Sequence, residues 1–119
     1  MSENTEQEVI EYASADDLFE MDDPTSATAD VMLPRGKRVK VRGMTRYELM
    51  LTRKGTEDAA EIERRMISMC LIEPRMTGAQ VDRWQKSTGP MVMAPVTEAI
   101  RRLSGLGDDA DKSDVQENG

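Results

Sequence analysis

This sequence predicts a mainly α-helical domain with a short β-hairpin, flanked by disordered acidic tails. Three observations lead to this prediction: apolar residues recur at helical spacing in four segments, an alternating stretch precedes them, and charge is segregated along the chain. Residues 1–30 carry ten acidic and no basic side chains, residues 31–107 carry fifteen basic and eight acidic ones, and residues 108–119 carry five acidic side chains and one lysine. The chain of 119 residues is therefore expected to hold one basic domain, residues 31–107, between acidic arms.

Residues 1–30 are predicted to be a disordered acidic arm, because they contain too few large apolar side chains to offset the entropy of ordering. Leu18, Phe19 and Met21 are an exception within this acidic stretch. They indicate either a short helical recognition motif for a partner or incidental apolar side chains on a solvated arm. Residues 108–119 are predicted to be a disordered acidic tail for the same reason.

A β-hairpin is predicted at the start of the basic domain. Two short segments, residues 31–33 and 38–42, flank a turn that Pro34 and Gly36 favour. The second segment alternates valine with lysine and arginine, so one face is apolar and the other is basic. Because an isolated two-stranded ribbon is marginal in water, its apolar face is expected to pack on the helices. The charge pattern also suggests that the acidic arm folds back loosely over this basic ribbon and competes with partners.

The first two helices are predicted over residues 45–54 and 57–72. Thr45 and Glu48 have the spacing of a capping box, in which each side chain accepts a hydrogen bond from the other residue's backbone N–H. The second helix has an apolar stripe at helical spacing, and Pro74 is expected to end it because the residue before a proline prefers an extended conformation.

The third helix is predicted to begin after Thr77, which forms a second capping box with Gln80. The last is predicted as a helix that starts near Pro90 and kinks at Pro95, because its apolar stripe reaches Val92 in register while Pro95 removes a backbone hydrogen bond. The alternative is a helix that begins near Ala94 with Pro95 in its first turn. Gly105 is placed to end it in the left-handed conformation. The predicted core, taken from these periodicities, consists of Val39, Val41, Met50, Leu51, Ile62, Met66, Met69, Cys70, Val81, Trp84, Val96, Ile100 and Leu103.

Several classes of protein are disfavoured by composition. Cys70 is the single cysteine and the chain has no histidine, so an internal disulfide is excluded and no zinc-site spacing exists. No apolar run approaches the ~20 residues that span a membrane, and the acidic N-terminus lacks the features of a signal peptide. Without histidine, an activated carboxylate pair or a phosphate-binding glycine loop, we expect no enzymatic activity, no metal and no cofactor.

The order of three motifs resembles the tail assembly chaperones of long-tailed (siphovirus-type) bacteriophages. These motifs are Thr45 to Glu48 at a helix start, Leu71 to Thr77 at a junction, and Ile100 to Gly105 at the last helix end. The resemblance covers about two-thirds of the chain. Pro95 and the segment 91–93 depart from the family's usual pattern and leave the shape of the last helix open.

This resemblance implies a binding role in viral tail assembly. Proteins of the family keep the tape measure protein soluble and help to recruit tail tube subunits, and they are absent from the mature virion. The implied location is the cytoplasm of the host bacterium, and the implied partners are the tape measure protein and the tail tube protein. Self-association is also considered, whereas a membrane partner is not expected.

The methionine content independently favours a binding surface. The chain has ten methionines but few aromatic residues, and flexible thioethers adapt to irregular apolar partners. The alternative is that methionine simply fills a small core. The residues predicted to contact a partner are Met44, Tyr47, Met76, Met91, Met93, Arg38, Lys40 and Arg42.

The basic ribbon, residues 35–42, supports an alternative function as a small nucleic-acid-binding regulatory protein. The acidic arms would repel nucleic acid, and the ribbon lacks aromatic side chains for base stacking. Binding of nucleic acid is therefore the less favoured prediction.

Overall fold

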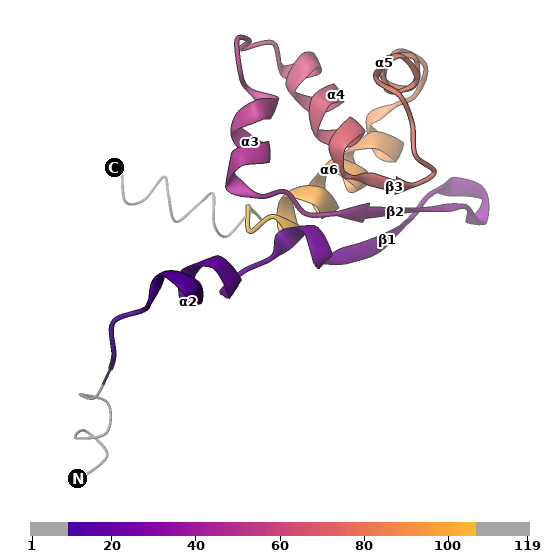
Figure 1. The fold of residues 1–119 in the computed structure, drawn as a ribbon. Helices are drawn as coiled ribbons and strands as arrows, with labels where there is room; N and C mark the ends of the chain where they lie inside the picture. Colours follow the sequence, from indigo (N-terminus) through magenta and orange to yellow (C-terminus); the bar gives the residue numbers. More distant parts are fainter. Residues whose placement is uncertain (1–9, 107–119) are drawn as a thin grey trace, which may run out of the picture.

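A computed structural model describes residues 10–106 of the chain. Five α-helices and a three-stranded antiparallel sheet make up this part of the protein, which is mainly α-helical, as predicted from the sequence (Figure 1). In chain order the elements are α2 (Ala15–Glu20), η1 (Pro24–Ser26), β1 (Thr28–Met32), η2 (Pro34–Gly36), β2 (Arg38–Arg42), α3 (Arg46–Thr52), α4 (Ala59–Cys70), β3 (Leu71–Glu73), α5 (Gly78–Ser87) and α6 (Pro90–Leu103). Residues 1–9 of the predicted arm and the predicted tail, 108–119, lie outside the described residues.

The predicted hairpin is present, and it begins earlier than the sequence indicated. β1 pairs with β2 from Thr28 opposite Arg42 to Met32 opposite Arg38, so residues 28–30 belong to the sheet and not to the arm. Pairing with the basic strand β2 explains the extension, because Asp30 lies diagonally opposite Arg38 and forms an ion pair with it at 3.6 Å. The turn contains Gly36 at φ 72°, as expected, and also Arg35 at φ 69°.

A third strand replaces the predicted end of the second helix. α4 ends at Cys70 instead of Ile72, and β3 pairs antiparallel with the inner strand β2. Pro74 imposes an extended conformation on Glu73, and Leu71 is 1% exposed opposite Val41. Leu71 and Ile72 therefore belong to the sheet, whereas helical periodicity alone predicts that they continue the helix.

Side-chain caps determine where three helices begin. Thr45 and Thr77 form the two predicted capping boxes, and Asp58 accepts a hydrogen bond from the Ala60 N–H at 3.0 Å. The last helix begins at Pro90, as predicted, and continues through the exposed Pro95 to Leu103. The predicted kink at Pro95 stays a prediction.

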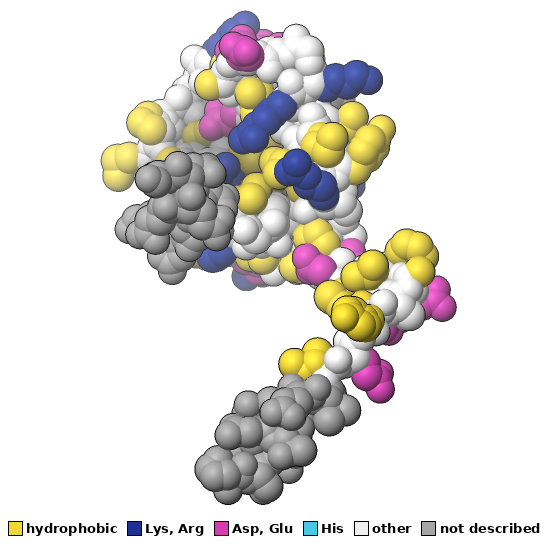
Figure 2. Space-filling view, turned by 90° about the vertical axis from the view of Figure 1, so that its left-hand side faces the viewer, with side chains coloured by type: hydrophobic (Ala, Val, Ile, Leu, Met, Phe, Trp, Pro, Cys, Tyr) yellow, Lys and Arg dark blue, Asp and Glu magenta, His cyan; other side chains and the backbone are white. Residues whose placement is uncertain are grey.

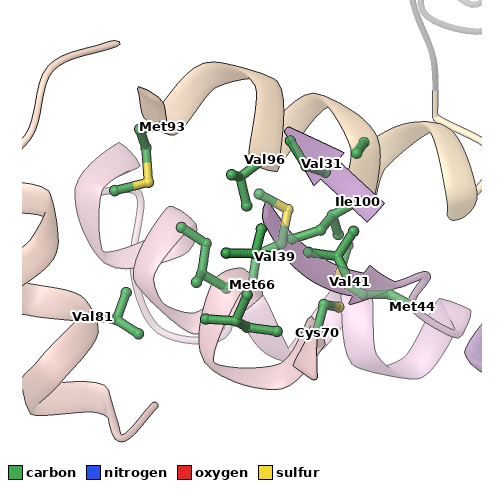
Figure 3. Close-up of a cluster of buried hydrophobic side chains, with 13 residues drawn as sticks. Val31, Val39, Val41, Met44, Met66, Cys70, Val81, Met93, Val96 and Ile100 are labelled. Carbon is green, nitrogen blue, oxygen red and sulfur yellow. The ribbon is translucent and has the colours of Figure 1, made fainter. Parts of the chain in front are cut away.

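Helix α6 packs on the sheet, and α4 joins α3 and α5 to α6. α6 lies behind the sheet in Figure 1 and contacts both β1 and β2, while α4 contacts α3, α5 and α6. Figure 3 shows Val39 and Val41 of β2 in the same cluster as Val96 and Ile100 of α6. Among the residues predicted for the core, these four, together with Met66, Cys70 and Val81, are buried.

The burial of several methionines differs from the prediction. Met50 was predicted to be in the core but is 54% exposed, because α3 is a short surface helix whose inner face is formed by Leu49 and Thr52. Met44 and Met93 were predicted to contact a partner, but they are only 2% and 6% exposed. Met44 begins the connection under α3, and Met93 lies on the core side of α6 (Figure 3). The remaining predicted core residues are partly buried: Leu51, Ile62, Met69, Trp84 and Leu103.

Candidate polypeptide-binding groove

An open groove of about 430 Å³ lies between the distal end of the hairpin and α5. Its apolar lining comes from segments that are far apart in the sequence, including Leu33 after β1, Met76 before α5 and Trp84 within α5. The complete lining is Leu33, Val39, Leu71, Pro74, Met76, Gln80, Arg83, Trp84 and Ser87. Leu33, Met76 and Trp84 pack against the hydrophobic core. The groove therefore extends from the core to the surface.

Local structure positions the two largest side chains of the groove. The Thr77 cap begins α5 directly after Met76, and the buried Val81 fixes α5 against the core. Trp84 lies three residues after Val81, which places both on neighbouring positions of one helical face. Met76 and Trp84 are thus held by the core on one side and remain partly accessible on the other.

The groove has positive charge at its edge and no acidic residue in its lining. Arg83 lines it directly, and the exposed Arg75 lies between two lining residues. An apolar segment that carries carboxylates is the chemically matched ligand for such a groove.

Three of the predicted partner-binding bases lie elsewhere. Arg38, Lys40 and Arg42 alternate with the buried valines of β2, so they lie on the opposite face of the sheet from the groove. Arg42 donates two hydrogen bonds to the Glu48 carboxylate, each at 3.0 Å. The hydrogen bonds from Arg42 hold the pKa of Glu48 below its ordinary value, and the Thr45 backbone N–H has the same effect.

The other predicted partner residues are exposed but scattered. Tyr47 is 68% exposed on α3, and Met91 is 88% exposed in the first turn of α6. Neither lines the groove with Met76. The prediction missed Leu33 and Arg83 as groove residues, since single residues after a strand and on a polar helix face carry no distinctive local signal.

Cys70 is buried in the core and close to the Arg42–Glu48 pair. Burial raises the pKa of its thiol to about 12, which outweighs the opposing effect of Arg42. At neutral pH the side chain is therefore a protonated thiol and a poor nucleophile. Within residues 10–106 no three potential metal ligands come together.

No helix in the described part of the chain is both long and apolar enough to cross a membrane. Comparison with known proteins found no matching family model, no matching curated protein and no matching solved structure. The candidate site is therefore defined by its geometry and by the residues that line it.

Proposed function

We propose that this protein is a phage tail assembly chaperone that binds segments of the tape measure protein in the groove between the hairpin and α5. The observation that carries this proposal is the open apolar groove formed by Leu33, Met76 and Trp84 with Arg83 at its edge. The order of motifs from Thr45 to Gly105 is the basis for proposing this family, and the groove is the surface proposed to bind other polypeptides.

The composition of the groove suits a client with many dissimilar apolar segments. A methionine side chain changes rotamer at low cost, and a tryptophan offers a large apolar surface with one hydrogen-bond donor. The small size of the site favours weak and reversible contacts, and several copies along one long client would add to its solubility. Reversible binding agrees with a chaperone that leaves before the tail is complete.

The rest of the proposed role follows from the same resemblance. The protein acts in the cytoplasm of the host bacterium, helps to recruit tail tube subunits to the tape measure protein, and is absent from the mature virion. It uses no cofactor and performs no bond chemistry.

Co-expression with a tape measure protein tests the proposal. We expect the full chain to raise the soluble yield of the tape measure protein, and Met76→Glu/Arg83→Glu to remove most of that increase. Arg53→Glu is the matched control, because Arg53 is also exposed and basic but lies at the end of α3, outside the groove. Equal yields with and without the chaperone, or with the two variants, would contradict the proposal.

The nucleic-acid alternative predicts a different result. A regulator that uses the basic ribbon would shift a DNA or RNA probe, and the shift would weaken steeply with salt. Arg42 is engaged with Glu48, and Arg38 is paired with Asp30, so less of the ribbon's charge is free for phosphates than the sequence suggests. A salt-sensitive probe shift without any effect on the tape measure protein would favour this alternative.

A further inference from the structure

The N-terminal arm contains a short, capped helix, α2, that exposes apolar side chains to solvent. Ser14 and Asp17 form a capping box at the start of α2, so this helix is specified locally. Leu18, Phe19 and Met21 are 62%, 79% and 67% exposed. Figure 2 shows yellow side chains gathered on this segment, which stands away from the body beside acidic groups in magenta.

The arm and the groove are complementary in both polarity and charge. Residues 10–23 carry six carboxylates and no basic side chain, whereas the groove lining contains Arg83 and no carboxylate. Arg75 follows the lining residue Pro74 and Glu73 precedes it, so the positive charge of the groove itself comes from Arg83. An acidic helix with Leu18 and Phe19 on its surface therefore has the chemistry expected of a ligand for this groove.

The arm joins the folded body at residues 23–27, which we call its root. The root is held at the end of the hairpin that is far from the groove. Asp23 caps the turn η1, and the Gly43 N–H donates to the carbonyls of both Pro24 and Ala27 at 3.1 Å. Gly43 follows the end of β2 that pairs with Thr28, whereas Leu33, which lines the groove, follows the opposite end of β1.

This anchoring holds the arm near the end of the hairpin that is away from the groove of its own chain. Three residues separate Phe19 from Asp23, so the Cα atom of Phe19 lies at most about 14 Å from that of Asp23 when this segment is fully extended. Thr28 and Leu33 alone are about 16 Å apart along the strand, because each residue of a strand advances about 3.3 Å.

We propose that the helix α2 of one copy docks in the groove of a second copy, with Leu18 and Phe19 against Met76 and Trp84. The donating and accepting surfaces are different and lie at opposite ends of the molecule. Such a contact is heterologous, so each copy retains one free arm and one free groove, and copies add head to tail. The loose folding back of the arm over the basic ribbon, predicted from charge alone, stays a separate prediction.

Docking between copies uses the groove assigned to the client under the proposed function. A tape measure segment and a neighbour's arm would compete for it, which keeps the groove covered until a client is present. The self-association itself requires no client, so it can be tested separately from the chaperone role.

Sedimentation velocity on the purified full chain tests the proposal with two variants. Leu18→Ser/Phe19→Ser removes the donor surface, and Met76→Glu/Arg83→Glu removes the acceptor surface. At protein concentrations up to about 1 mM, where a small interface associates, we expect the natural chain to form a concentration-dependent series of oligomers. Each variant alone is expected to be monomeric, with association weakened about tenfold or more.

Mixing the two variants provides the decisive measurement. The donor-defective copy keeps its groove and the acceptor-defective copy keeps its arm, so the mixture is expected to form a 1:1 dimer and nothing larger. Met32→Thr is the matched control, because Met32 is 64% exposed but lies on β1 outside both surfaces, and it should oligomerise like the natural chain. Raising the salt concentration should weaken all of these complexes.

Three outcomes would overturn the proposal. A natural chain that stays monomeric at all concentrations has no such contact. A mixture of the two variants that stays monomeric, while the natural chain oligomerises, excludes the pairing of arm with groove. Oligomers that persist in the arm variant assign self-association to another surface. Circular dichroism and thermal melting of each variant establish that loss of association is not loss of folding.

Discussion

Gly43 is the residue at which the arm, the hairpin and the last helix meet, and replacing it by alanine provides a sharp test of the packing. Gly43 is buried, and a Cβ atom at this position would lie 2.6 Å from the Leu103 carbonyl oxygen and 2.8 Å from the Pro24 carbonyl oxygen. Both are backbone atoms, which cannot move aside as the end of a flexible side chain can. The backbone at Gly43 or around both carbonyls must therefore shift to admit a methyl group.

The cost of Gly43→Ala follows from two contributions. Overpacking a closely packed site typically costs about 1–3 kcal/mol. The required shift also strains the hydrogen bonds from the Gly43 N–H to Pro24 and Ala27, and each such bond contributes about 1 kcal/mol. We expect the free energy of unfolding to fall by about 2–4 kcal/mol, which lowers the Tm of a domain of this size by roughly 10–20 °C.

Chemical and thermal denaturation followed by circular dichroism measure this change. Gly78→Ala is the matched control, because no atom lies within 4 Å of a Cβ atom at Gly78 and the residue begins α5. Alanine there should stabilise the protein by up to about 1 kcal/mol, since it reduces the entropy of the unfolded chain and favours the helix. A loss below about 1 kcal/mol for Gly43→Ala would refute the close packing of the three segments.

Three further predictions concern individual interactions. Glu48→Gln keeps the capping box but removes the ion pair with Arg42, so stability should fall by about 0.5–1 kcal/mol at pH 7. Because the folded-state pKa of Glu48 is lowered from the ordinary 4.5, this difference should shrink as the pH falls below that value, and a pH-independent difference would contradict the assignment. Thr77→Ala should cost about 1 kcal/mol by uncapping α5, as urea denaturation would measure, whereas an unchanged midpoint would exclude a stabilising cap. The buried Cys70 should react with iodoacetamide only as fast as the protein unfolds, and rapid alkylation of the native protein would disprove its burial.

The methionines divide between structural and surface roles according to their tertiary environment. Met44, Met66 and Met93 are buried in the core, whereas Met91 is almost fully exposed. Met76 lies between these extremes, with one side packed against the core and the other open to the groove. Core packing therefore accounts for Met44, Met66 and Met93, and partner binding by the accessible methionines stays a prediction.

Local signals in the sequence were sufficient to predict most element boundaries. Thr45 and Thr77 cap the helices that their capping boxes predicted, and Gly105 adopts the left-handed conformation at φ 81°. These features depend on atoms within a few residues of one another, so a short stretch of sequence contains the information that specifies them. The start of the last helix near Pro90 was predicted from the apolar stripe, which reaches Val92 in register.

The core was predicted less completely, because helical spacing indicates a stripe but not how much of that stripe is covered. Val96 and Ile100 lie under the sheet, whereas Met50 belongs to a helix too short and too peripheral to bury its predicted stripe. Periodicity alone allows Met93 to face either the core or solvent. In the structure it belongs to the core cluster, where neighbouring elements cover it.

By itself, the sequence determined the helix caps, the hairpin turn, the segregation of charge and the small aliphatic character of the core. Only the tertiary structure decided that Leu71 to Glu73 join the sheet, and that Leu33, Met76 and Trp84 line one groove. Only the tertiary structure, too, placed the root of the acidic arm at the end of the molecule away from that groove. The physical reason is that caps and turns are formed between near neighbours, whereas strand pairing and grooves require residues that meet only when the whole chain has packed.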